Sequence, residues 1–316
     1  MTFLNALPGA ISQGLIYGIM AIGVYITYKI LDIADLTVDS SFCTGAATFV
    51  MLFTGGVNIW LALLAAVAVG MLAGLCTGLL HTLCGIPAIL AGILTQLGLW
   101  SVNMAIMGMK ATVAINVTAQ GGMLDKLMVY LRFVQDEASG VRRIYRHPIF
   151  VVGVFTVVLI GVLYWFFGTE LGAALRATGS NANMARAQGI DTDFTKVLGR
   201  RGSTGQVALS GALLAQYNSA SEINMGRGAI VIGLAAVIIG EVIFGKVFQN
   251  FALKLLGVSF GAIIYYIVLQ AVLAMGLNPN YLKLLSAIIV AIFLSVPYWK
   301  RKYFGKSVKK EVAGNA

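Results

Sequence analysis

The feature that most constrains this chain is a series of long apolar segments with few or no charged residues. Residues 57–82, for example, contain no Asp, Glu, Lys or Arg. A helix crosses the hydrocarbon core of a bilayer with roughly 20 apolar residues, so this segment is long enough to span a membrane. The whole chain is 59% hydrophobic and 11% charged, whereas soluble domains carry about 25% charge. These values exclude an ordinary soluble enzyme, a disordered protein and a nucleic-acid-binding domain, and they predict an all-α polytopic membrane protein.

We predict about nine transmembrane helices, within a range of eight to ten, in a single transmembrane domain over residues 1–316. The expected spans are 6–28, 38–53, 57–82, 87–108, 149–168, 204–221, 228–245, 251–275 and 283–299. The second span is short, so we expect a broken or re-entrant helix there, which is tolerated only where protein or water surrounds it. Glycines spaced four residues apart predict closely packed helices. They occur at Gly14/Gly18, Gly70/Gly74/Gly78 and Gly257/Gly261.

The distribution of Lys and Arg predicts the orientation, because cytoplasmic loops carry an excess of basic residues. With the N-terminus outside and nine spans, fourteen of the 22 Lys and Arg residues lie inside. A basic tail, residues 300–316, directly follows the last span. We therefore expect the N-terminus outside the cell and the C-terminus in the cytoplasm.

The first of two long polar connections covers residues 110–148, which would form an external loop. Apolar residues at helical spacing within 123–134 predict an amphipathic helix in this loop. Two roles are open for that helix. It could lie on the membrane surface or cap the bundle, or it could provide a docking surface for a partner protein.

The second connection covers residues 169–196 and would face the cytoplasm. A set of capping residues marks the two ends of a short helix and the start of the next one. They are Ser180 or Asn181, Gly189, and Asp191 or Asp193. This pattern predicts a short helix parallel to the membrane, which could transmit force from a soluble motor to the bundle.

Motifs for catalysis and metal binding are absent from the sequence. It contains no P-loop, nucleophile elbow, His-Glu-x-x-His or Cys-x-x-Cys pattern. Cys43, Cys76 and Cys84 have no regular spacing, so we expect buried free thiols. Glu241 is the only acid deep in an apolar run. Such an acid needs a partner or water, and a structural partner or a gate is favoured over proton coupling. We expect no catalytic site, no metal site and no cofactor bound by this chain.

Several motifs resemble one family of membrane proteins. They are Leu-Arg-Ala-Thr-Gly at 175–179, Ala-Arg at 185–186, Gly-Ile-Asp at 189–191, the apolar run at 233–240, and Ala-Asp-Leu-Thr-Val-Asp-Ser at 34–40. Over nearly the whole chain, the sequence resembles the permease subunits of bacterial ABC importers, in the branch that includes branched-chain amino acid and ribose systems. Within that branch it is most similar to permeases for tryptophan or tyrosine, at residues 33–39, 90–95 and 106–108.

The resemblance implies a permease subunit in the bacterial inner membrane that forms the pathway for a small solute, an amino acid with an aromatic or apolar side chain. An external substrate-binding protein would deliver the solute. Two cytoplasmic ATPase subunits, which bind ATP and Mg, would drive transport. Two permease copies would form the pathway, with a homodimer expected and a heterodimer as the alternative.

The resemblance also implies that the 169–196 connection couples to the ATPase. The candidate coupling residues are Arg176, Asn181, Met184, Ala185, Arg186 and Gly189. Met184 and Ala185 would be buried in the contact, and Arg186 would pair with an acidic group. One nearby segment departs from the family pattern, because Arg200-Arg201-Gly202-Ser203 stands where relatives continue an apolar span. Either these arginines extend to the membrane interface and the helix starts late, or the segment is a local sequence anomaly.

Polar residues within or beside the spans are candidates for the solute pathway or its gate. They are Asp35, Asp39, Asn103 and Glu241. Asp35 and Asp39 would share one helix face in the protein interior. They would cap the helix at 38–53, or one of them would line the solute path. Tyr25, Tyr28, Trp100 and Asn103 would suit an aromatic or apolar solute, although aromatic residues in membrane proteins more often serve the core or the interface. The alternative class is an ion-gradient-driven secondary transporter, which would have to use the same acids.

Overall fold

The computed structural model describes residues 2–115, 148–245 and 247–275, together with Leu127, Val129 and a number of positions between 281 and 295. The described chain is almost entirely helical. Its helices are α1 (Thr2–Tyr25), the π-helical turn η1 (Ile26–Ile30), α2 (Val38–Thr54), α3 (Ile59–Thr82), α4 (Ala88–Ile106), α5 (Pro148–Gly168), α6 (Glu170–Ser180), α7 (Ala182–Ala187), α8 (Thr192–Asn218), α9 (Ala229–Phe244) and α10 (Phe251–Ala274). Two short strands, β1 (Thr112–Ala114) and β2 (Ala220–Glu222), pair antiparallel.

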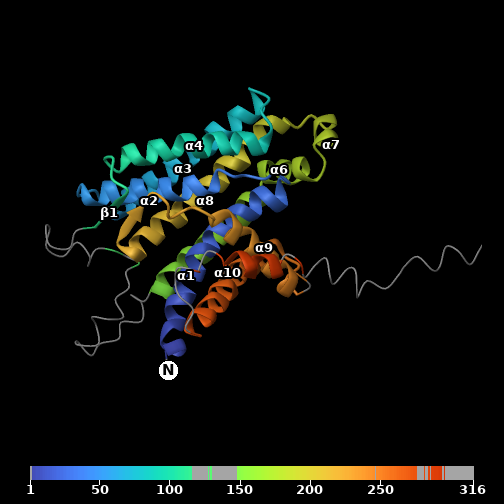
Figure 1. The fold of residues 1–316 in the computed structure, drawn as a ribbon. Helices are drawn as coiled ribbons and strands as arrows, with labels where there is room; N and C mark the ends of the chain where they lie inside the picture. Colours follow the sequence, from blue (N-terminus) through green and yellow to red (C-terminus); the bar gives the residue numbers. More distant parts are fainter. Residues whose placement is uncertain are drawn as a thin grey trace, which may run out of the picture.

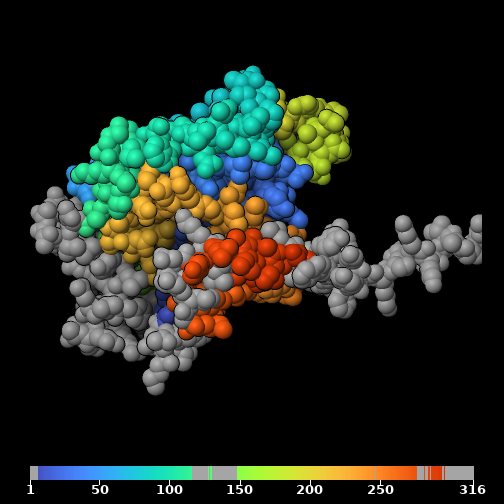
Figure 2. Space-filling model, viewed as in Figure 1, coloured from blue at the N-terminus to red at the C-terminus, as the bar shows by residue number. Residues whose placement is uncertain are grey.

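The helices pack in two groups that meet along α1 and α8. Helices α2 and α3 pack with α8, α4 packs on α2 and α3, and α5, α9 and α10 pack with α1 (Figure 1). Helix α7 lies at one end of the molecule and β1 lies at the opposite end. Figure 2 shows that α3 and α4 form one outer face and that α7 projects at its edge.

Helices occupy the first eight expected spans, and described positions between 284 and 295 are helical as well. Five of these helices are long and apolar enough to cross a membrane. Helices α2 and α9 are apolar but shorter, at 17 and 16 residues. The expected break in the second span is not observed, since α2 is one continuous helix. The irregular turn is η1, at the end of α1.

The late start, one of the two alternatives for the span at 204–221, is wrong, whereas the expected cap at Asp191 is confirmed. Helix α8 begins at Thr192 and is 27 residues long, because the Asp191 side chain caps it by accepting hydrogen bonds from the N–H groups of Asp193 and Phe194. Arg200 therefore lies well inside the helix and not near its start.

The expectation that both arginines extend to the membrane interface is also wrong. Arg200 is fully buried, whereas Arg201 is exposed. Adjacent residues point about 100° apart on a helix, and α8 is surrounded by α1, α2 and α3, so one of the two side chains must face the interior. The Arg200 Nη1 atom donates a long hydrogen bond of 3.4 Å to the carbonyl of Thr77. Its Nε and Nη2 atoms have no hydrogen-bond partner among the described residues.

Close helix packing at the small residues is confirmed. Gly14 and Gly18 face the backbone of α10 at Ile263 and Ser259, and Gly261 faces the backbone of α9 at Ala236. Small residues at these positions let the helix axes approach. All three cysteines are free, as expected, but only Cys43 is buried, and Cys76 and Cys84 are exposed.

Candidate functional site

Asp39 lies in the first turn of α2, but it caps another helix. Its Oδ2 atom accepts a hydrogen bond of 3.0 Å from the N–H of Gly228, and its Oδ1 atom accepts one of 2.9 Å from the N–H of Ile230. These N–H groups are at the start of α9, whose own N-cap residue, Gly228, has no side chain to serve this purpose. A carboxylate is favourable there because a helix N-terminus carries partial positive charge. The expectation that Asp39 caps the helix at 38–53 is therefore wrong.

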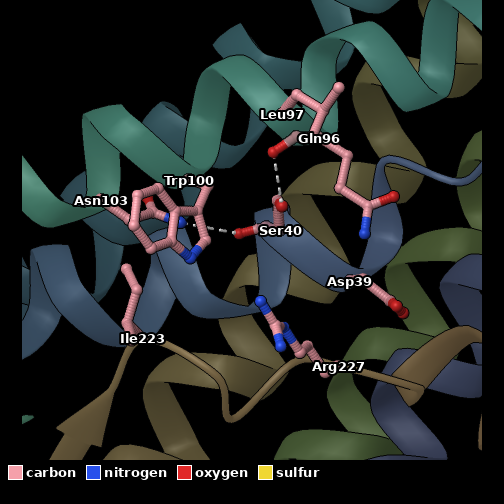
Figure 3. Close-up of a pocket in the computed structure, with 8 residues that line it drawn as sticks. All are labelled: Asp39, Ser40, Gln96, Leu97, Trp100, Asn103, Ile223 and Arg227. Atoms are coloured by element: carbon pink, nitrogen blue, oxygen red, sulfur yellow. Dashed lines mark hydrogen bonds between the residues drawn. The ribbon is translucent and has the colours of Figure 1, made fainter. Parts of the chain in front are cut away.

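A cavity of about 210 Å³ lies beside this cap. Its lining residues come from α2, α4 and the segment after β2 (Figure 3). They are Asp39, Ser40, Gln96, Leu97, Trp100, Asn103, Ile223 and Arg227. The structure thus brings two of the candidate pathway residues, Asp39 and Asn103, to one site. Gln96, Ile223 and Arg227 are lining residues that sequence reasoning missed.

Two hydrogen bonds fix the wall of the cavity between α2 and α4. Ser40 Oγ donates to the carbonyl of Gln96 at 2.9 Å, and Asn103 Nδ2 donates to the carbonyl of Ser40 at 3.2 Å. Asn103 is buried, whereas Leu97 and Trp100 are exposed. The cavity therefore has a rigid polar back wall and opens at the surface of the chain beside α4.

Asp35 does not belong to this site. It precedes α2, so it does not share a helix face with Asp39, and that expectation is wrong. The Asp35 side chain is buried, and its Oδ1 atom accepts a hydrogen bond of 3.0 Å from the N–H of Thr37. Its second oxygen has no partner among the described residues. The nearby charge that acts on it is the buried guanidinium of Arg200.

Glu241 lies apart from the cavity, near the end of α9. Its Oε1 atom is 2.8 Å from Lys29 Nζ on η1, and both side chains are about half exposed, at 50% and 47%. This ion pair gives Glu241 a structural partner that links η1 to α9.

A cap, a glycine turn and a side-chain hydrogen bond shape the connection between α5 and α8. Asn181 Oδ1 accepts a hydrogen bond of 3.0 Å from the N–H of Met184 and so caps α7. After α7, the chain turns at Gly189, which has a φ of +80° that glycine adopts without steric cost. Arg176 Nη2 donates to the carbonyl of Phe167 at 2.9 Å, which ties α6 back to α5. The short helix thus lies where the capping pattern predicts it.

The side chains of α7 differ from expectation at two positions. Ala185 is already buried within the chain, so it is not available to a partner. Arg186 pairs within the chain, because its Nε atom donates to Thr192 Oγ1 at 2.7 Å and its Nη2 atom lies 3.4 Å from Asp193 Oδ1. The exposed apolar side chains here are Met184, at 58% exposure, and Phe194, at 53%, and sequence reasoning missed Phe194.

Two expected features lie largely or wholly outside the described residues. They are the amphipathic helix at 123–134 in the 110–148 loop and the tail at 300–316. The described start of that loop forms β1, which pairs with β2 just after α8. Within the described part of the chain, no group of three His, Cys, Asp or Glu side chains could hold a metal ion.

Comparison with known proteins gives matches over most of the chain. Residues 7–294 match the family described as branched-chain amino acid transport system, permease component. The chain is 34% identical to the tyrosine transport system permease protein of Clostridioides difficile, over 92% of this chain and 91% of the relative. It is also 34% identical to an uncharacterised protein of Rickettsia prowazekii, over 92% of this chain and 98% of the relative. A fructose import permease of Bifidobacterium longum is 23% identical, over 82% of this chain and 68% of the relative. No solved structure matches the chain.

Proposed function

This chain belongs to the family of permease components of branched-chain amino acid transport systems, and from that membership we propose that the solute it transports is an amino acid with an aromatic or apolar side chain. As a permease of this family, it is the membrane subunit of an ABC import system. The similarity to a tyrosine permease over 92% of the chain supports an aromatic solute. The apolar helices agree with a multi-pass membrane subunit.

The proposed motor is a pair of cytoplasmic ATPase subunits that bind ATP and Mg, while this chain binds no cofactor. The proposed coupling to the ATPase is supported by α7. This short capped helix projects from one end of the molecule, and its Met184 side chain is exposed (Figures 1 and 2). An ATPase surface that receives this helix would bias the permease between its inward-open and outward-open states, because it binds the two states with different affinity.

The proposed assembly is a homodimer in the bacterial inner membrane, supplied by an external substrate-binding protein. We place the N-terminus outside and the C-terminus in the cytoplasm. This orientation puts α7 and the Lys29–Glu241 pair at the cytoplasmic end, and contacts between α6 and η1 support that common location. It puts β1 and β2 at the external end.

The orientation is tested with single cysteines in a background without Cys43, Cys76 and Cys84. Met184→Cys should react with an impermeant thiol reagent only from the cytoplasmic side, and Thr112→Cys only from outside, since both positions are exposed. The reverse labelling pattern would overturn the orientation.

The transport mechanism is tested in proteoliposomes that hold the permease, its ATPase subunits and ATP inside, with the binding protein outside. We expect uptake of labelled L-tyrosine to require ATP and to persist with a protonophore. Uptake by the permease alone under a proton or sodium gradient would favour a secondary transporter. Two contacts argue against that class, since Glu241 is paired with Lys29 and both oxygens of Asp39 hold the start of α9.

A further inference from the structure

We propose that the cavity beside Asp39 is a contact site for the zwitterion of an aromatic or apolar amino acid on its way through the membrane. In this site Arg227 binds the carboxylate, Asn103 binds the ammonium, and Trp100 contacts the side chain. The proposal rests on the proposed function, because it takes an amino acid to be the solute.

Arg227 is the cation of the site. It is the one basic residue among those that line the cavity, and its side chain is exposed. Its side chain makes no hydrogen bond or ion pair with any residue that the structure describes. Figure 3 shows its guanidinium below Ser40, between Ile223 and Asp39. An arginine with free N–H groups is suited to a carboxylate, because the planar guanidinium can donate two parallel hydrogen bonds to its two oxygens.

Asn103 provides an acceptor on the opposite wall. Its side chain is 1% exposed, and its Nδ2 atom is held by the carbonyl of Ser40. Its Oδ1 atom has no partner among the described residues. Buried polar atoms almost always have a hydrogen-bond partner, so an unpaired oxygen at a cavity wall is a place where a bound donor fits. An ammonium group supplies that donor.

Asp39 lies on the other side of the Arg227 guanidinium from Asn103 in the view of Figure 3. Both of its oxygens already accept hydrogen bonds from the start of α9, so the carboxylate is fixed in position. The carboxylate of the ligand therefore contacts Arg227, and its ammonium contacts the unpaired Oδ1 atom of Asn103. A sugar carries no carboxylate to pair with the guanidinium of Arg227.

Three of the remaining lining residues suit an apolar side chain. Trp100 is 42% exposed, and Leu97 and Ile223 also line the cavity. An indole ring provides a broad apolar face on which an aromatic ring can stack. The volume of about 210 Å³ is below the range of roughly 300–1,000 Å³ that is usual for drug-sized ligands, which fits a single amino acid.

The test is direct binding of labelled L-tyrosine to the purified permease–ATPase complex without the binding protein. Arg227→Gln should weaken this affinity at least about tenfold, because a charged hydrogen-bonded contact is lost. Trp100→Ala should weaken it as well. The matched controls are Arg201→Gln and Trp165→Ala, since both residues are exposed elsewhere on the chain, and they should bind like the wild type.

Competition by tyramine, which lacks the carboxylate, separates recognition from a general loss of folding. Tyramine should compete poorly with labelled L-tyrosine in the wild type. In Arg227→Gln it should compete about as well as unlabelled L-tyrosine, because that variant no longer binds the carboxylate. The site would be overturned if Arg227→Gln binds L-tyrosine with wild-type affinity or still discriminates against tyramine as the wild type does. It would also be overturned if the wild-type complex does not bind L-tyrosine. Uptake by the complete importer is measured in parallel. If the wild type imports no aromatic or apolar amino acid, the proposed function fails; if it does so while Arg227→Gln binds normally, only the site fails.

Discussion

The Asp39 carboxylate on α2 accepts a hydrogen bond of 2.9 Å from the N–H of Ile230 on α9, a residue 191 positions later in the chain. This contact fixes the start of α9 against the first turn of α2. It also places a negative charge at the edge of the cavity that Arg227 and Trp100 line. The start of a helix and the wall of a candidate solute site are therefore held by one side chain.

Removal of this cap should destabilise the protein. Asp39→Ala leaves the N–H groups of Gly228 and Ile230 without acceptors, and we expect a loss of about 1–2 kcal/mol in the free energy of unfolding. Asp39→Asn keeps one acceptor oxygen and should cost less. Thermal unfolding of the purified complex measures both. If Asp39→Asn abolishes uptake while the complex stays assembled and hydrolyses ATP, the charge of Asp39 serves transport beyond capping.

Gly211 should not tolerate alanine, because a Cβ atom there meets the backbone of Phe42 on α2. Backbone atoms cannot move aside as a flexible side chain can, so Gly211→Ala should destabilise by about 1–3 kcal/mol. Gly161→Ala is the matched control, since that helical glycine on α5 has no atom near its Cβ position. The control should be neutral or slightly stabilising, because alanine favours a helix more than glycine does. Equal unfolding temperatures for the two variants would contradict the close contact of α2 and α8.

The Lys29–Glu241 pair should contribute little to stability, because both side chains are about half exposed. We expect Glu241→Gln and Lys29→Met each to change the free energy of unfolding by at most about 1 kcal/mol. The double variant should show a coupling of similar size in a double-mutant cycle. Both single variants should retain ATP-driven uptake. Loss of uptake in Glu241→Gln alone, with an intact complex, would assign Glu241 a role in transport that the ion pair does not explain.

Substitutions on α7 should separate coupling from folding. Met184→Glu places a charge on an exposed apolar position, so it should reduce co-purification of the ATPase and uptake without loss of stability. Met184→Leu is the conservative control and should behave like the wild type. Arg186→Glu removes the hydrogen bond to Thr192 and sets a carboxylate beside Asp193, so it should lower the unfolding temperature. Normal uptake and ATPase binding by Met184→Glu would argue against α7 as the coupling element.

The buried charges of Arg200 and Asp35 attract each other, so single and double substitution should have different effects. Arg200→Met removes the opposite charge that acts on Asp35 and should therefore destabilise the protein. The double variant Asp35→Asn, Arg200→Met removes both charges and should be at least as stable as the wild type. The control is Arg201→Met, an exposed position where the change should stay within about 0.5 kcal/mol. Equal unfolding temperatures for Arg200→Met and the double variant would show that the two charges do not interact.

The starts of α7 and α8 could be predicted from the sequence because their caps are local. Asn181 bonds to Met184, and Asp191 bonds to Phe194, three residues away in each case. A hydrogen bond between residues this close in sequence depends on the local backbone conformation and little on the packing of distant helices. Arg186 on α7 differed from expectation because its partners, Thr192 and Asp193, lie at the start of α8.

The lengths of the apolar segments likewise determined where the membrane helices lie, because a bilayer of fixed thickness requires a minimum apolar length. The same segments did not determine which side of each helix is buried. A helix that is apolar on all sides presents the same pattern to lipid and to other helices. For this reason the exposure of Cys76 and the burial of Arg200 followed only from the packing.

The sequence by itself determined that acidic and basic residues in apolar surroundings need partners, but the tertiary structure decided which partners they have. Asp39 accepts hydrogen bonds from the start of α9, and Glu241 forms an ion pair with Lys29. Arg227 lines the same cavity as Asn103. Each of these relations joins residues more than a hundred positions apart. The cost of an unpaired charge in an apolar environment is a local property of the residue, whereas the group that offsets that cost is set by the packing of helices distant in the sequence.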